Sequence, residues 1–258
     1  MLFRSVHMPE VGLAMSVAAG LGAIADRLGA AEESAVGRLA AAVAESAWLR
    51  EEARERMRAG MAGDGIPPAA FCEAIADAVG HEDLVVDEGL TSGRWLRTAL
   101  ERRGPGNWLA HRGSALGWGL PAAVGAKLAD PKRGVMCVHG DGSFLFGVHA
   151  LWTAARERLG LAVVVADNSG YEILRAGLEG LTGRPKGGWP GLAIADPPVD
   201  LVAISRGFGA SAERIEHRDQ LGDALRDLWR RAEGGPAVLV VRVAGRTPAV
   251  GYPVEPPG

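Results

Sequence analysis

Two apolar runs near the middle of the chain each end at a side chain that could bind a metal ion. Asp141 comes shortly after the run Val135–Val138, and Asn168 comes shortly after the run Leu161–Ala166. Both runs are typical of buried strands in a parallel sheet, and the pattern over Phe146–Arg158 predicts a helix between them. Ligands of open parallel sheets bind at the carboxyl ends of the strands. We therefore expect Asp141 and Asn168 to lie together at one edge of a sheet.

The ligands offered at this edge are all oxygens. Asp141 supplies a carboxylate, Asn168 an amide oxygen, and the turn at Gly170 a backbone carbonyl. Mg²⁺ prefers hard oxygen ligands in an octahedral arrangement and usually takes several of them from phosphate. The pattern therefore predicts a metal-bound diphosphate, with Asp141, Asn168 and Gly170 as the protein's ligands.

The residues around Asp141 suit close contact with a phosphate. Gly140 and Gly142 carry no side chains, so the backbone can approach a ligand there. The backbone amide of Ser143 opens toward the start of a predicted helix, where negative charge is favoured. We expect all three residues to contact the diphosphate.

These segments resemble a known family. Gly140-Asp-Gly-Ser143, followed one helix and one strand later by Asp167-Asn168, is similar to the signature of thiamine-diphosphate-dependent enzymes. That signature usually ends in two asparagines; Asp167 departs from it, while Asn168, at the metal-ligand position, is kept. Gly117–Gly125 and Ala150–Ala155 look most like the benzoylformate decarboxylase branch, to which the acetolactate synthases are related.

The resemblance covers roughly residues 66–243. It implies an α/β fold with three layers: a mainly parallel sheet with helices on both faces, preceded by a helical extension. Residues 1–65 would be a helical connector or the remnant of an upstream domain, and residues 66–246 the diphosphate-binding domain. Residues 247–258 would be a Pro-rich tail.

The resemblance also implies that the chain is incomplete. In the family, the glutamate that activates the aminopyrimidine comes from a pyrimidine-binding domain of a neighbouring subunit, and no segment here resembles that domain. We expect either a fragment of a longer protein or one chain of a split enzyme. It would work in a homo- or hetero-oligomer and would contain no certain catalytic residue of its own.

Further cofactor contacts follow from the resemblance alone. Leu116 matches the bulky residue that wedges under the thiamine and keeps it bent, and the carbonyl near Ser114 would accept from the aminopyrimidine. Tyr171 follows the metal-binding turn. Thr91 lies in the loop that reaches the diphosphate, although Thr91 or Ser92 could instead cap a helix predicted over residues 93–102.

The predicted helix Glu172–Leu181 would lie over the cofactor and form the substrate pocket with Ile173, Leu174 and Gly177. Pyruvate decarboxylases carry a catalytic glutamate at the position of Leu174. An apolar wall favours a bulky or apolar 2-oxo acid. The resemblance therefore implies a 2-oxo-acid decarboxylase similar to benzoylformate decarboxylase, or alternatively a carboligase of the acetolactate synthase type.

A second interpretation comes from a different class. Gly117-x-Gly119-x-x-Ala122 follows a predicted strand and precedes Asp141, which is close to the fingerprint of NAD(P)-dependent Rossmann oxidoreductases. Pro121 lies inside that turn, however, and the interpretation leaves Asn168 without a role.

Composition excludes several classes. The chain has 258 residues and a net charge of −3 from 28 basic and 31 acidic residues, which argues against nucleic acid or an anionic membrane as a partner. No apolar run approaches the length of a membrane span. Cys72, Cys137 and His139 have no partner pattern and are expected to pack. We expect a cytoplasmic protein.

Overall fold

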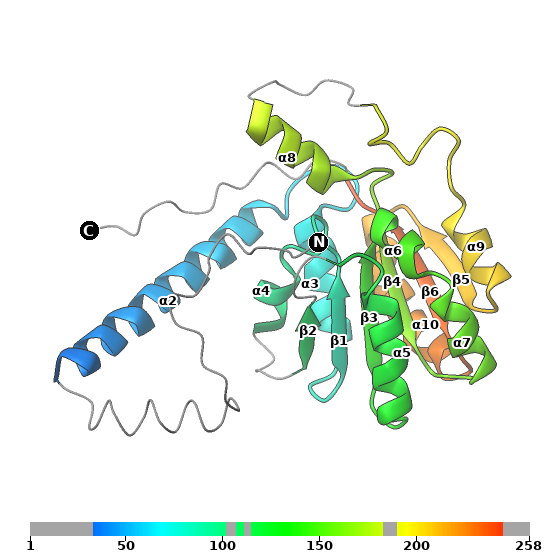
Figure 1. The fold of residues 1–258 in the computed structure, drawn as a ribbon, viewed down its shortest axis with the longest axis horizontal. Coiled ribbons are helices and arrows are strands. Elements are labelled where there is room, and N and C mark those ends of the chain that lie inside the picture. Colours follow the sequence, from blue (N-terminus) through cyan, green and yellow to red (C-terminus); the bar gives the residue numbers. More distant parts are fainter. Residues whose placement is uncertain (1–32, 102–106, 111–114, 183–189, 245–258) are drawn as a thin grey trace, which may run out of the picture. The chain divides into compact units, whose positions relative to one another are not determined.

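The computed structural model describes residues 33–101, 107–110, 115–182 and 190–244 of the chain (Figure 1). Backbone contacts divide the chain into two units, residues 1–49 and residues 50–258. In the first unit the described part is the beginning of helix α2 (Glu33–Ala59). Leu39 and Val43 of this helix are 65% and 61% exposed, so this part of α2 contributes no core.

The second unit is built on one parallel sheet of six strands in the order β2-β1-β3-β4-β6-β5. β3 and β4 are neighbours near its middle, and every residue of β4 is buried. Such continuous burial explains the uninterrupted apolar runs, because helices cover both faces of the sheet. The bounds of the strands are β1 Leu84–Glu88, β2 Trp108–Ala110, β3 Val135–Gly140, β4 Ala162–Asp167, β5 Ser211–Ile215 and β6 Ala237–Arg242.

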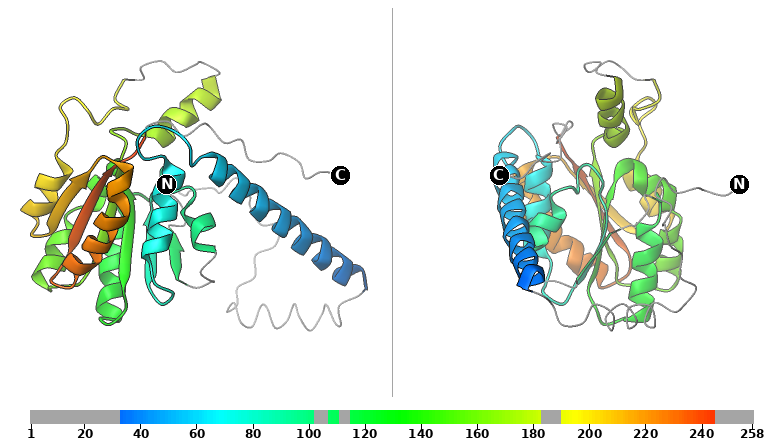
Figure 2. Two further views of the ribbon diagram at one scale, coloured as in Figure 1. Left: turned by 180° about the vertical axis from the view of Figure 1, so that it is seen from behind. Right: turned by 60° about the vertical axis from the view of Figure 1, so that its left-hand side comes forward.

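The helices form the two outer layers, as the views in Figure 2 show. One core lies between the sheet and the helices α3 (Pro68–Ala78), α4 (Leu96–Leu100) and α10 (Leu221–Ala232), which follows the short turn η2 (Arg218–Gln220). The other lies under α5 (Gly119–Ala129), α6 (Asp141–Gly147), α7 (Ala150–Arg156) and α9 (Leu201–Gly207). The predicted α/β fold with three layers is confirmed.

Helix α8 (Glu172–Thr182) differs from the others, because none of its residues is buried. It lies beyond the carboxyl end of β4, at the top of Figure 1. Its position agrees with the predicted helix over the site.

The connection from β2 to β3 crosses β1. β2 is the edge strand beside β1, whereas β3 lies on the other side of β1. Helix α5, which makes this connection, packs against both β1 and β3. The turn before α5 is thereby placed near the end of β1.

One predicted helix is wrong in its bounds. The expected single helix Phe146–Arg158 is two helices, α6 and α7, and α6 already begins at Asp141. A Cβ atom on Gly147 would lie 2.8 Å from the carbonyl oxygen of Gly117, so the backbones touch where α6 ends. Within α7, Trp152 is 55% exposed, while Leu151 beside it is fully buried.

The predicted cap at Thr91 or Ser92 is also wrong. Helix α4 begins only at Leu96, and Trp95 precedes it without a side-chain cap. The residues from Thr91 to Trp95 form turns instead. The Ser92 hydroxyl is therefore available for another contact.

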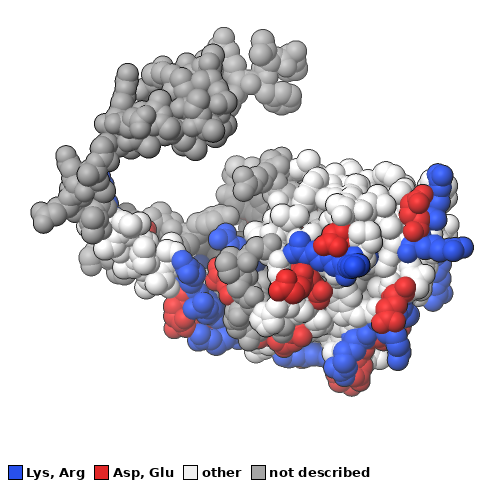
Figure 3. Space-filling view, turned by 90° about the horizontal axis from the view of Figure 1, so that it is seen from below, with Lys and Arg blue, Asp and Glu red and all other residues white. Residues whose placement is uncertain are grey.

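Within the described residues no helix is long and apolar enough to cross a membrane. Figure 3 shows the face seen from below Figure 1, where basic and acidic side chains lie interspersed. The described basic side chains on that face form no continuous surface. Cys72 and Cys137 are both buried free thiols.

Core packing by α10 can be tested with one substitution. Leu228 is fully buried, so Leu228→Ala should lower the free energy of unfolding by roughly 2–5 kcal/mol, because it leaves a cavity. Leu128 of α5 is 51% exposed, and Leu128→Ala should change that free energy by less than about 1 kcal/mol. Urea denaturation measures both, and equal effects would contradict the burial described here.

Candidate functional site

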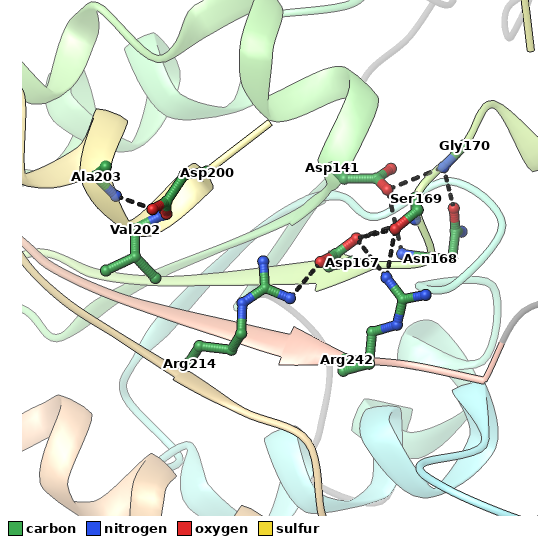
Figure 4. A network of polar contacts seen from close by, with 10 residues as sticks. All are labelled: Asp141, Asp167, Asn168, Ser169, Gly170, Asp200, Val202, Ala203, Arg214 and Arg242. Carbon is green, nitrogen blue, oxygen red and sulfur yellow. Dashed lines mark hydrogen bonds and ion pairs between the residues drawn. The ribbon is translucent and has the colours of Figure 1, made fainter. Parts of the chain in front are cut away.

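The two predicted metal ligands meet at the carboxyl ends of β3 and β4 (Figure 4). Asp141 Oδ2 accepts from the backbone N–H of Asn168 at 3.2 Å and from that of Gly170 at 3.1 Å. Asn168 Oδ1 accepts from the same Gly170 N–H at 3.1 Å. The two side-chain oxygens thus converge on the same N–H, that of Gly170.

The Asp141 carboxylate is an almost buried anion, with 3% of the residue exposed. Burial raises the pKa of Asp141 from 3.8 to about 6, although backbone N–H groups, including that of Gly142 at 2.7 Å, act in the opposite direction. The nearby Asp167 carboxylate adds to the rise. Backbone dipoles alone therefore do not fully compensate this charge, and a cation would.

Glycines permit the tight geometry of the site. A Cβ atom on Gly142 would lie 2.6 Å from the ring of Tyr171, and one on Gly170 would lie 2.9 Å from the carbonyl oxygen of Leu192. Tyr171 is tied to the same segment, because its N–H donates to that Leu192 oxygen at 3.0 Å. Gly140 is different, since the nearest atom to a Cβ there would be 3.8 Å away. Its missing side chain leaves open space rather than relieving a clash.

Ser143 turns its side chain into the protein. Its hydroxyl donates to the carbonyl oxygen of Glu88 at 3.0 Å and accepts from the Gly140 N–H at 3.1 Å. The residue is 3% exposed, so its side chain ties the turn at Asp141 to the end of β1. Contact with a ligand is left to its backbone.

The loop after β1 also reaches the site. Asn168 Nδ2 donates to the Ser92 hydroxyl at 3.4 Å, and Ser92 is buried. Thr91 beside it is half-buried. The role of Ser92 in orienting Asn168 was missed from the sequence, although its place after the strand next to β3 could have indicated it.

Asp167, the departure from the family signature, is neutralised by two arginines. Arg214 donates to Asp167 Oδ2 at 2.6 Å and Arg242 to Oδ1 at 3.3 Å. Burial acts to raise the pKa of Asp167, but the two guanidinium groups hold it below its ordinary value. These residues line a pocket of about 350 Å³ that Asp141 also borders. The arginines come from β5 and β6, and nothing in their local sequence pointed to Asp167.

The predicted pocket residues of α8 are accessible. Ile173 is 46% and Leu174 is 52% exposed, and Gly177 is exposed as well. Glu172 pairs with Arg175, so its carboxylate is engaged within the helix.

The turn before α5 presents Leu116, which is 42% exposed. Gly117 behind it has a φ of +83°, and a Cβ there would lie 2.9 Å from Phe146 Cβ. Ser114 lies outside the described residues, and the prediction for it stays a prediction.

No group of three or more His, Cys, Asp or Glu side chains that could hold a metal is found among the described residues. A metal site here consequently depends on one carboxylate, one amide and a backbone carbonyl. This oxygen donor set fits Mg²⁺, which takes few protein ligands and completes its shell from phosphate and water.

Comparison with known proteins identifies the fold and its cofactor. A family model described as "Thiamine pyrophosphate enzyme, C-terminal TPP binding domain" matches residues 89–241. The chain belongs to this family. The site at the ends of β3 and β4 thus lies in a domain that binds thiamine diphosphate, another name for thiamine pyrophosphate.

Relatives of this thiamine-diphosphate-binding domain include both expected branches. Benzoylformate decarboxylase of Pseudomonas aeruginosa is 37% identical over 59% of this chain and 28% of its own. A Mycobacterium tuberculosis protein provisionally named as an acetolactate synthase large subunit, IlvX, is 37% identical over 66% of this chain and 34% of its own. The chain spans about a third of the length of the curated relatives it matches.

A solved structure agrees with these relatives. Benzoylformate decarboxylase from Polynucleobacter necessarius superposes with a TM-score of 0.64 at 27% identity. The match covers 74% of this chain and 35% of that one. The predicted family resemblance is confirmed.

The sheet order argues against the dinucleotide interpretation. In a Rossmann fold the glycine-rich turn and the acidic residue follow neighbouring strands. Here β2 precedes Gly117 and β3 precedes Asp141, and β1 lies between them. Both the geometry and the family match favour thiamine diphosphate.

The buried charge of Asp141 gives a pH-dependent prediction for the metal-free protein. The pKa of Asp141 is raised from 3.8 to about 6, so the folded protein binds this proton more tightly than the unfolded chain does. The proton therefore stabilises the folded state fully below about pH 3.8, and this contribution is lost as the pH rises through about 6. Asn carries no such proton. The free energy of unfolding of Asp141→Asn, relative to wild type, should therefore increase by roughly 1–3 kcal/mol from about pH 4 to pH 8. Denaturation in the presence of a chelator measures it.

Asp167→Asn is the matched comparison, because the pKa of Asp167 is lowered. The stability contributed by that carboxylate is present above its unfolded pKa of about 3.8 and is lost only as the pH falls through its lower folded value. The Asn variant should therefore be less stable than wild type from about pH 8 down to about pH 4. A pH dependence of the same sign in both variants would contradict this assignment of the two charges.

Proposed function

We propose that this domain binds Mg²⁺-thiamine diphosphate and forms part of a 2-oxo-acid decarboxylase. Asp141, Asn168 and the carbonyl of Gly170 would hold the metal. The observation that carries the proposal is the pair of oxygens on Asp141 and Asn168 that flank the Gly170 N–H. When bound, thiamine diphosphate supplies an electron sink for decarboxylation.

The chain's own residues bind and orient that cofactor. The backbone at Gly140, Gly142 and Ser143, together with Thr91, would contact the diphosphate. The half-exposed Leu116 would support the thiamine. The carbonyl near Ser114 would accept a hydrogen bond from the aminopyrimidine. The ring of Tyr171 packs against Gly142. Exclusion of water would come from α8 above the site.

The substrate would be a bulky or apolar 2-oxo acid. Ile173 and Leu174 expose apolar surface on α8, and Gly177 on the same helix leaves room. Relatives named as benzoylformate decarboxylases favour an aromatic 2-oxo acid. The alternative is carboligation, favoured by relatives named as acetolactate synthases, such as an isozyme of Escherichia coli.

Activity would require a pyrimidine-binding domain, upstream in the same protein or on another chain. The chain spans about a third of the length of its relatives. We assign no described residue at the site as the activating glutamate. The working enzyme would then be a homo- or hetero-oligomer.

Metal-dependent cofactor binding tests the proposal directly. Calorimetric titration of the full chain with thiamine diphosphate should show binding with Mg²⁺ and none with a chelator. Asp141→Asn should weaken binding roughly 10-fold or more, because a metal ligand loses its charge. Asp223→Asn is the control, because Asp223 is exposed on α10, pairs with Arg226 and does not border the pocket that Asp141 lines. Equal affinity in the two variants would refute the metal site.

Turnover gives a second test. The full chain, loaded with Mg²⁺ and thiamine diphosphate, should release no detectable carbon dioxide from benzoylformate or pyruvate. Addition of a pyrimidine-binding domain from a relative should produce release from benzoylformate in preference to pyruvate. Strong decarboxylation by the chain alone would show that the activating group lies within it.

A further inference from the structure

A second buried carboxylate lies behind the site. Glu88 is the last residue of β1 and is fully buried. Its cross-strand neighbour on β3 is His139, also fully buried. The Nδ1 atom of His139 lies 3.7 Å from Glu88 Oε2 and 3.4 Å from the Ser143 hydroxyl.

Both oxygens of Glu88 bind the turn before α5. Oε1 accepts from the Gly117 N–H at 2.6 Å, and Oε2 accepts from the Gly119 N–H. The N-cap residue of this helix, Trp118, makes no side-chain cap hydrogen bond. Gly119 must also be glycine, since a Cβ there would lie 2.8 Å from Glu88 Oε2.

Glu88 is itself held in place from two sides. The Ser143 hydroxyl donates to its carbonyl oxygen, which links Glu88 to the turn at Asp141. Burial lowers the pKa of His139 to about 3, so the imidazole beside the carboxylate is neutral. Among the described residues His139 Nε2 has no hydrogen-bond partner, which favours the tautomer with the proton on Nδ1, facing Glu88 and Ser143.

Three loops therefore converge on one residue. They are the loop after β1 with Thr91, the turn before α5 with Leu116, and the turn at Asp141. Each of them carries a contact of the proposed cofactor site. Burial of a carboxylate is unfavourable, and an apolar residue of similar volume commonly stabilises the folded state as well. Stability alone therefore does not account for Glu88 at this position.

We infer that Glu88 is a positioning residue, which holds the Leu116–Gly119 turn against the ends of β1 and β3 and so sets the support on which the thiamine part of the cofactor rests. This inference rests on the proposed function. The Glu88 side chain binds the turn before α5, whereas its link to the proposed diphosphate site is its backbone carbonyl, which accepts from the Ser143 hydroxyl. A substitution of the side chain leaves that carbonyl in place. Its effect should consequently fall on the thiamine and spare the diphosphate.

Two probes separate these effects: Mg²⁺-thiamine diphosphate and Mg²⁺-pyrophosphate, which lacks the thiamine. In Glu88→Gln the amide NH₂ would face one of the two backbone N–H groups, so the turn loses one of its acceptors. The affinity of the full chain for Mg²⁺-thiamine diphosphate should fall roughly 10-fold or more. Its affinity for Mg²⁺-pyrophosphate should stay within about twofold. Equal losses for both probes, or no loss, would overturn the inference.

The same titrations distinguish this inference from the proposed function. Asp141→Asn should weaken the binding of both probes, because it removes the metal ligand on which both depend. If wild type binds neither probe, the proposed function fails, and the role of Glu88 fails with it. If Asp141→Asn weakens both probes but Glu88→Gln does not discriminate between them, only the present inference fails.

A double-mutant cycle tests whether Glu88 acts through Leu116. Leu116→Ala removes a half-exposed side chain and should weaken the binding of Mg²⁺-thiamine diphosphate but not that of Mg²⁺-pyrophosphate. In that background Glu88→Gln should add less than about twofold. Additive losses would mean that Glu88 acts by another route.

Gly119→Ala covers the case in which Glu88→Gln does not fold. The added methyl group would lie 2.8 Å from Glu88 Oε2 and would displace the carboxylate while keeping its charge. The same selective loss for thiamine diphosphate is expected, and an unchanged ratio of the two affinities would overturn the inference.

Discussion

The site depends on one interaction across two neighbouring strands: the Asp141 carboxylate accepts the backbone N–H groups of Asn168 and Gly170. It joins the turn after β3 to the turn after β4. The Ser92 hydroxyl, which accepts from the Asn168 side chain, adds a contact to the loop after β1. The parallel pairing of β3 with β4 brings the two turns together, and the carboxylate sets their geometry.

Asp141, Asp167 and Glu88 are buried carboxylates at this edge of the sheet, and each is compensated differently. Asp141 has backbone amides, Asp167 has two arginines, and Glu88 has the amides of the α5 turn. The two arginines hold the pKa of Asp167 below its ordinary value against the effect of burial, whereas burial raises the pKa of Asp141, whose hydrogen-bond donors are backbone N–H groups. The site is thus prepared for a cation at Asp141 and not at Asp167.

Much of this architecture could be predicted because it follows from local patterns. Continuous apolar runs indicated the central strands, and polar residues at their ends indicated that Asp141 and Asn168 would meet. Arg214, Arg242 and Glu88 could not be assigned this way, since their partners lie far along the chain and only the order of the strands brings them together. The break between α6 and α7 was missed for a similar reason, because the contact of Gly147 with Gly117 is tertiary.

Helix α8 has eleven residues and buries none of them. A peptide helix of that length is marginal in water, and most helices in proteins owe their stability to packing. A partner surface or a ligand that covered its apolar side would therefore stabilise it. In the proposed decarboxylase, the entropy lost on such ordering would weaken the closed complex and so speed the release of product.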